Sequence, residues 1–309
     1  MKLKKIANMP EPFGVEIYDI PLLNEMTRSE WRELGKICLQ HLVWIIPNQN
    51  ISKHVFARIA YSWGKPGLFT ENDFNQIQDK KIKNEVYDEL IRMSITNLPG
   101  LARVTGIKTE DGKATGMFSD GELDWHSNES GKENPHPVVL LHGISGTKNS
   151  QTQFLENVTK YEKLTTEDKL FFDSLECIYH YNGTNIYSDV TGLSGVSATQ
   201  NQIVRINTYA SNEPFIKKLV LTSPGGFKGF AFNFNTFHKF VDKTEKESNE
   251  IKEWLKDLLI VDKDIYTHNW EDGDIIAFDQ IVTLHRRPTK DCSNRLLHRI
   301  SCDFSKISL

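Results

Sequence analysis

The sequence is poor in cysteine. Its four cysteines (Cys38, Cys177, Cys292 and Cys302) are scattered over 309 residues and form no Cys-x-x-Cys pair. Closely spaced pairs are typical of thiolate zinc sites, and dense sets in short secreted chains are typical of disulfide frameworks. The isolated thiols fit neither class, and we interpret each as a small buried hydrophobic side chain. They indicate a reducing compartment, and we expect the cytoplasm.

Long apolar runs and a strong charge imbalance are also absent. No run reaches the ~18 apolar residues that a membrane-spanning helix needs, and residues 1–14 carry lysines without the apolar stretch of a signal peptide. The net charge of −4 gives no reason to expect nucleic acid or membrane as a partner. Without a repeat or a linker, the sequence predicts a single domain over residues 1–309.

The first part of the chain predicts helix, strand and helix in turn. Thr27 followed by Glu30 has capping-box spacing ahead of a helical apolar pattern. Residues 42–46 (LVWII) form a short apolar run that predicts a buried strand. Ser52 can cap a second helix, which we expect to end at Gly64.

Short β-like runs between turns dominate the rest of the chain. We expect strands at 138–142, 217–222, 229–234, 275–284 and 295–302 and helices at 165–175 and 251–259. We also expect surface loops and edge structure in 67–120 and a long loop at 181–200. Early helices followed by many short strands indicate an α+β protein, a β-sandwich or jelly roll with helices packed outside.

The first segment with candidate chemistry is DWHSNE at residues 124–129. On an extended strand the side chains of His126 and Asn128 point to the same face, while Glu129 points away. A histidine with an oxygen donor two residues later can offer a metal two ligands from one backbone segment.

The second segment begins at His285 and continues to Arg295 and Arg299. On an extended strand the two arginines share one face. Burying both would be costly unless they meet anions, and the planar guanidinium suits a carboxylate or sulfonate. Surface salt bridges explain the same spacing equally well.

Together these segments resemble the taurine dioxygenase-like family of Fe(II)/2-oxoglutarate oxygenases. The resemblance spans nearly the whole chain, with LGKICLQHLVWIIPNQNIS, WHSNE, SQTQFLEN, GFAFNFNTFHKFVDKTEKES, NWEDGDIIAFDQIVTLHRRP and NRLLHRIS in the right order. It implies a cupin-like double-stranded β-helix core. It also implies Fe(II) held by two histidines and one carboxylate, which leave three positions for co-substrate and O₂.

The resemblance also implies roles for residues outside the metal site. Thr152 and Arg295 would bind the far carboxylate of 2-oxoglutarate, and Arg299 would face an anionic group of the substrate. Trp270 and Phe278 match structural positions on the late strands, and we assign them to packing.

At the metal site the sequence departs from the family pattern. The resemblance makes His126 and His285 the histidine ligands, but Asn128 stands where the family has a carboxylate. Asn128 could bind iron weakly while 2-oxoglutarate completes the site. Glu129 could instead rotate in, although strand alternation opposes this. In a third interpretation, redox chemistry is lost while the fold and the anion pocket remain.

The resemblance therefore implies a 2-oxoglutarate-dependent non-haem iron dioxygenase. It would hydroxylate or desaturate a small anionic substrate with O₂, giving succinate and CO₂. The alternative is a non-catalytic binding or scaffold protein on the same fold, which Asn128 favours. The retention of His126, His285, Thr152 and Arg295 together favours the enzyme. The oligomeric state stays open, and a homo-oligomer is compatible with the sequence.

Overall fold

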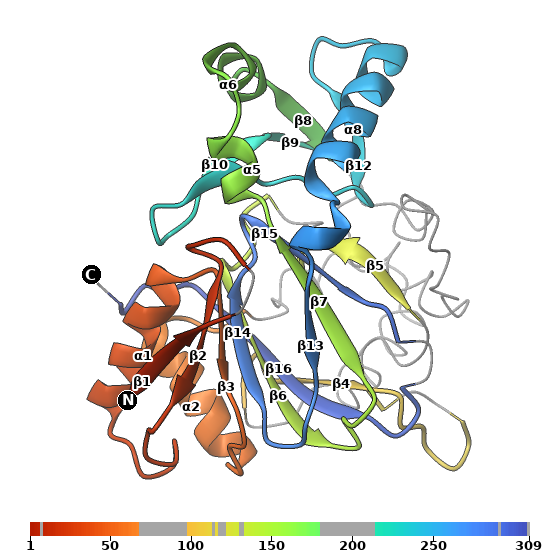
Figure 1. The fold of residues 1–309 in the computed structure, drawn as a ribbon. Coiled ribbons are helices and arrows are strands. Elements are labelled where there is room, and N and C mark those ends of the chain that lie inside the picture. Colours follow the sequence, from red (N-terminus) through yellow and green to blue (C-terminus); the bar gives the residue numbers. More distant parts are fainter. Residues whose placement is uncertain are drawn as a thin grey trace.

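Two β-sheets stack against each other and form the centre of the molecule (Figure 1). The computed structural model describes residues 1–6, 9–67, 98–112, 115–116, 122–129, 133–179, 214–289 and 292–307. The larger sheet has the spatial order β1 (Lys2–Lys5), β2 (Gly14–Tyr18), β3 (Val43–Ile46), β14 (Ile275–Asp279), β6 (Val138–Ser145), β16 (Leu296–Cys302) and β4 (Ala102–Thr105). The smaller sheet has the order β13 (Tyr266–Asn269), β7 (Gln151–Glu156), β15 (Thr283–Arg287) and β5 (Leu123–His126).

Alternation along the central strands fills the space on both sides of the larger sheet. Val43 and Ile45 belong to the cluster between the two sheets, together with Phe154 of β7. Trp44 and Ile46 belong to the cluster on the opposite face. A strand covered on both faces reads as one continuous apolar run, which is why residues 42–46 show no alternation in the sequence.

Helices α1 (Arg28–Gln40) and α2 (Lys53–Trp63) cover the outer face of the larger sheet (Figure 1). The predicted capping box at the start of α1 is present, with the Thr27 side chain accepting from the Glu30 amide and Glu30 accepting from Thr27. Ser52 caps α2 as expected. Trp63 of α2 packs edge-on against Trp44 of β3, with ring centroids 5.6 Å apart. These contacts leave the other face of the sheet for the cavity between the sheets.

A smaller lobe lies above the two sheets in Figure 1. It contains the sheet β12 (Phe237–Phe240), β8 (Glu176–Tyr179) and β9 (Phe215–Lys218), the hairpin β10 (Val220–Thr222) and β11 (Lys228–Phe230), and the helices α5 (Val158–Glu162), α6 (Thr166–Asp173) and α8 (Glu245–Leu259). A short 3₁₀ turn, η2 (Asp262–Asp264), leads back to β13. Its aromatic cluster, which includes Phe172 and Phe230, is separate from the core between the sheets.

The prediction of one strand over residues 275–284 is wrong. The segment forms β14 in the larger sheet and β15 in the smaller sheet. The chain turns between them because the Asp279 carboxylate accepts hydrogen bonds from the amides of Ile281 (2.8 Å) and Val282 (3.3 Å). This turn carries His285 across to the smaller sheet.

Three smaller differences concern the second lobe. The predicted strand 217–222 is interrupted at Leu219 between β9 and β10, and the predicted strand 229–234 ends at Phe230. Helix α8 begins at Glu245 rather than near residue 251, because Thr244 and Glu247 form a capping box.

The remaining sequence predictions concern the cysteines, two loop-rich regions and membrane-spanning helices. All four cysteines are buried and free, as expected. The predicted loop 181–200 and most of the region 67–120 lie outside the described residues. The described part of 67–120 contains β4, which lies at the edge of the larger sheet, in agreement with the edge structure expected there. In the described part of the chain, no helix has the length and apolar character to cross a membrane.

Candidate active site

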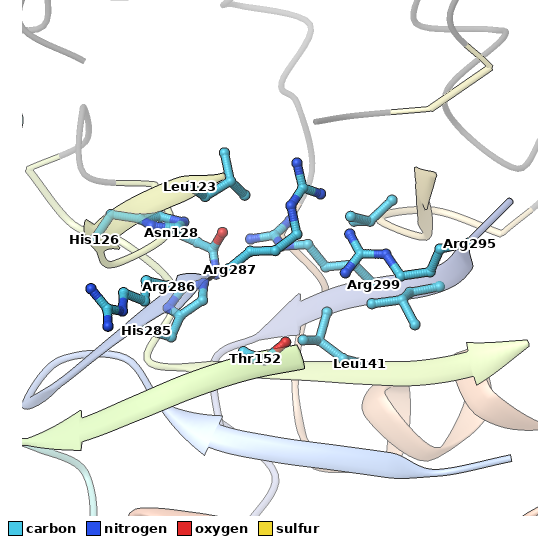
Figure 2. A pocket seen from close by; sticks show the side chains of 12 residues that line it. Leu123, His126, Asn128, Leu141, Thr152, His285, Arg286, Arg287, Arg295 and Arg299 are labelled. Carbon is cyan, nitrogen blue, oxygen red and sulfur yellow. Dashed lines mark hydrogen bonds between the residues drawn. The ribbon is translucent and has the colours of Figure 1, made fainter. Parts of the chain in front are cut away.

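A cavity opens between the two sheets. Its lining includes all six residues that the sequence singled out, His126, Asn128, Thr152, His285, Arg295 and Arg299. Figure 2 shows the histidines and Asn128 on one side of this cavity and Arg295 on the other, with Arg299 between them.

Strand pairing places the two histidines side by side. His126 ends β5, His285 lies in the middle of β15, and the two residues are direct partners in the antiparallel pair. Their ring centroids are 4.2 Å apart. β7 pairs with the other edge of β15 and brings Thr152 to the same cavity.

The environment of His126 fixes its protonation. Its Nδ1 lies 2.6 Å from the backbone carbonyl of Asp124, which can only accept. Nδ1 therefore carries the proton, and the lone pair of Nε2 is available to a metal. Burial, reinforced by the charges of Arg287 and Arg299, lowers the pKa of His126 to about 4 despite the opposing hydrogen bond to Asp124.

Burial is also the chief reason that His285 is neutral. Burial lowers its pKa well below the usual range, and the nearby His126 and Arg299 lower it further. Neutral imidazole is the form that binds metals. Both histidines are therefore held in the ligand form.

Asn128 lies directly against His285. Its Nδ2 is 3.3 Å from Nε2 of His285. A half-turn of the amide exchanges Nδ2 with Oδ1, which would bring an oxygen donor beside the two ring nitrogens. Within the described residues, no three His, Cys, Asp or Glu side chains gather in a way that could hold a metal. The donor set here is two imidazoles and one neutral amide.

Glu129 is held away from this donor set. Its backbone has a positive φ of 59°. Its carboxylate accepts from the amide of His136 (3.0 Å), from Nδ1 of His136 (2.9 Å) and from Oγ of Ser301 (2.8 Å). Glu129 is not among the residues that line the cavity. These contacts argue against the interpretation in which Glu129 replaces the missing metal carboxylate.

Arg295 and Arg299 differ in what surrounds them. Arg299 lies 3.8 Å from the Glu129 carboxylate, measured from its Nη2. Arg295 has only 2% of its surface exposed and makes no such carboxylate contact among the described residues, while the Nε atoms of both arginines are buried without a hydrogen-bond partner there. Burial lowers the pKa of Arg295. A buried guanidinium with an unused N–H is costly unless an anion meets it, so Arg295 is a candidate for an anion subsite.

A comparison with known protein families identifies the family of this chain. Residues 5–301 match the family described as "Taurine catabolism dioxygenase TauD, TfdA family". The chain belongs to this family. The predicted family, fold class and enzyme class, a dioxygenase, are thereby confirmed.

Solved structures agree with the family at the level of fold. A taurine dioxygenase from Burkholderia xenovorans is 16% identical, with a TM-score of 0.68 over 97% of this chain and 88% of that chain. AAD-2, solved in complex with Mn(II) and N-oxalylglycine, is 18% identical, with a TM-score of 0.66 over 98% of this chain and 97% of that chain. Curated proteins gave no match.

Two further arginines of this TauD/TfdA-family chain line the cavity. Arg287 shares the face of His285 because the two lie two positions apart on β15. Arg286 also reaches the lining, where its guanidinium lies 4.7 Å from the Trp125 ring and its Nε donates to Gln153 at 2.5 Å. Neither arginine was expected at the site from the sequence, although strand alternation from His285 indicates that Arg287 shares its face.

The predicted packing roles of Trp270 and Phe278 agree with their burial, since 1% and 0% of their surfaces are exposed. Phe278 lies between the sheets, with its ring centroid 4.8 Å from that of His285. Trp270 does more than pack, because its Nε1 donates a 2.9 Å hydrogen bond to Oγ1 of Thr152. Packing alone therefore does not describe Trp270.

Proposed function

We propose that this protein is an Fe(II)/2-oxoglutarate-dependent dioxygenase that hydroxylates or desaturates a small anionic substrate. The proposal rests on the positions of three side chains in one cavity. Two neutral imidazoles stand on one wall of the cavity, and a buried guanidinium with an unused N–H stands on the same cavity's other side. This combination suits a ligand that chelates a metal at one end and carries a carboxylate at the other, as 2-oxoglutarate does.

The residues fit a metal ion with an unusual donor set. His126 and His285 would supply nitrogen ligands, and Asn128 would supply its amide oxygen after the half-turn. An amide leaves the metal one charge unit more positive than a carboxylate does. The dianion 2-oxoglutarate would offset part of this difference, so we expect iron and 2-oxoglutarate to bind more tightly together than either does alone.

The residues also fit 2-oxoglutarate. Arg295 and Thr152 would hold its far carboxylate through charge-assisted hydrogen bonds. The structure of AAD-2 contains Mn(II) and N-oxalylglycine, which differs from 2-oxoglutarate by an NH in place of one CH₂, and this supports 2-oxoglutarate as the kind of ligand. When bound, iron and 2-oxoglutarate would supply the oxidation, in which O₂ and 2-oxoglutarate give succinate and CO₂ while the second oxygen atom enters the substrate as a hydroxyl or leaves as water with two of the substrate's hydrogens.

The arginines set the class of substrate. Arg287 and Arg299 line the cavity nearer to the histidines than Arg295 does in Figure 2. Arg299 would bind an anionic group of the substrate, a carboxylate or a sulfonate, while Arg295 binds the co-substrate. The apolar lining, Val104, Leu123, Leu141 and Leu297, would exclude water and hold a small carbon skeleton.

An anaerobic titration tests the proposal. Fe(II) and then 2-oxoglutarate are added to the purified protein, and the visible metal-to-ligand charge-transfer band is followed. We expect the band to appear in the natural protein and in a His54→Ala control on the exposed face of α2. It should be lost in His126→Ala and in His285→Ala.

The second candidate is a metal-free protein that binds anions. The contact between the Asn128 amide and Nε2 of His285 favours it, because that hydrogen bond occupies a ring nitrogen that iron would need. In that case 2-oxoglutarate or another small dianion would bind by calorimetry with equal affinity with and without metal. The charge-transfer band would be absent.

A further inference from the structure

The hydroxyl of Thr152 has a defined direction. Nε1 of Trp270 lies 2.9 Å from Oγ1 of Thr152, and both side chains are buried. An indole N–H can only donate, so Oγ1 must accept in this contact. The proton of the Thr152 hydroxyl therefore points toward some other group.

The groups around Thr152 indicate that its hydroxyl proton points into the cavity. The Thr152 backbone is used in the sheet, where it pairs with His268 of β13 and lies beside β15 on the other edge. No acceptor among the described residues takes the hydroxyl proton. Thr152 lines the cavity, and Figure 2 shows its oxygen beside Leu141, on the side of the arginines.

Trp270 is itself held in one orientation. Its amide donates to the carbonyl of Ser150 at 3.1 Å, and its ring meets His268 edge-on with centroids 4.9 Å apart. Gly143 leaves just enough room opposite, since a Cβ there would lie 3.3 Å from Cε3 of Trp270. The indole therefore acts as a fixed donor behind Thr152.

We propose that Trp270 is a positioning residue that commits the Thr152 hydroxyl to donate into the cavity. This inference rests on the proposed function, because the acceptor would be the far carboxylate of 2-oxoglutarate. With Arg295 and Thr152 both donating, the subsite selects a group that only accepts. Without the indole, the hydroxyl could rotate and accept instead, and the preference for a carboxylate would weaken.

A double-mutant cycle tests the assignment. The dissociation constant of 2-oxoglutarate is measured by calorimetry on Mn(II)-loaded protein, in which no turnover occurs. Thr152→Val should weaken binding about 10- to 100-fold, as expected for the loss of a hydrogen bond to a charged group. Trp270→Phe should weaken it about 3- to 10-fold, and the double variant should bind no more weakly than Thr152→Val, because the two residues act as one unit.

Two control variants separate positioning from folding. Trp63 is also buried, its Nε1 also donates to an oxygen (the Trp31 carbonyl), and it lies on the helix side of the larger sheet. Trp63→Phe should therefore lower stability without changing 2-oxoglutarate affinity. Thr152→Ser keeps the hydroxyl and should keep most of the affinity.

A second measurement does not depend on the Trp270 variant folding. The indole N–H of Trp270 should resist hydrogen exchange in the natural protein and in Thr152→Ser, and should exchange faster in Thr152→Val. Losses that simply add in the cycle, or an unchanged exchange rate, would overturn the positioning role alone. If the natural protein does not bind 2-oxoglutarate, both the proposed function and this inference fail.

Discussion

The Asn128 amide lies 3.3 Å from Nε2 of His285, at the position where the resemblance to the family implies a metal carboxylate. The neighbouring Glu129 cannot take over without giving up its hydrogen bonds to His136 and Ser301. In the proposed iron site, the strength of metal binding would therefore depend on one neutral side chain.

Replacing Asn128 by aspartate should tighten Fe(II) binding. A carboxylate adds a negative charge beside two neutral imidazoles, and changes even one shell further out typically alter metal affinity ~10- to 100-fold. We expect a gain of at least ~10-fold, measured by anaerobic metal titration without 2-oxoglutarate. Glu129→Gln is the matched control and should change iron affinity less than Asn128→Ala does. The reverse order would identify Glu129 as the hidden ligand.

Replacing Arg295 by alanine should abolish 2-oxoglutarate binding while the fold survives. The guanidinium is buried, and the removal of one partner of a buried charge pair typically costs ~3–5 kcal/mol, a factor of more than 100 in affinity. Calorimetry with Mn(II)-loaded protein measures the loss. Arg28→Ala, at the exposed start of α1, should leave it unchanged. Unaltered affinity in Arg295→Ala would remove this residue from the co-substrate site.

Parts of this site were accessible from the sequence. Alternation predicted that His126 and Asn128 share a face, and both line the cavity, although β5 ends at His126 and Asn128 lies in the turn after it. The turn at Asp279 was missed because the apolar run continues on both sides of it. The hydrogen bond from Trp270 to Thr152 joins residues that are 118 positions apart in the sequence. Neither the periodicity of one strand nor a short motif could therefore indicate it.

Acid should destabilise the metal-free protein through its buried histidines, and His298 offers the cleanest test. Burial, with further contributions from His142, Arg103 and Lys53, lowers the pKa of His298 from 6.5 to about 4. Below pH 6.5 the unfolded chain binds this proton before the folded protein does. The stabilisation is therefore complete above pH 6.5 and is lost as the pH falls toward 4.

The expected change in the free energy of unfolding follows from the two pKa values of His298, 6.5 in the unfolded chain and about 4 in the folded protein. Between pH 7.5 and pH 5 this group should cost about 2 kcal/mol of unfolding free energy. Urea denaturation of the natural protein and of His298→Phe at the two pH values measures the difference. The variant should lose less stability on acidification. Equal slopes would mean that His298 titrates normally in the folded protein.

Gly146 should control the position of Arg295. It follows β6 with a positive φ of 61°, and a Cβ there would overlap the carbonyl of Asn294, next to Arg295. Gly146→Ala should therefore push the segment before β16 and weaken 2-oxoglutarate binding as well as lower stability. Gly226 has a similar φ of 84°, but nothing lies within 4 Å of a Cβ built on it. Gly226→Ala should share the backbone strain, about 1 kcal/mol, and leave co-substrate affinity intact. If both variants lost stability equally and neither lost affinity, the contact with Asn294 would have no role in placing Arg295.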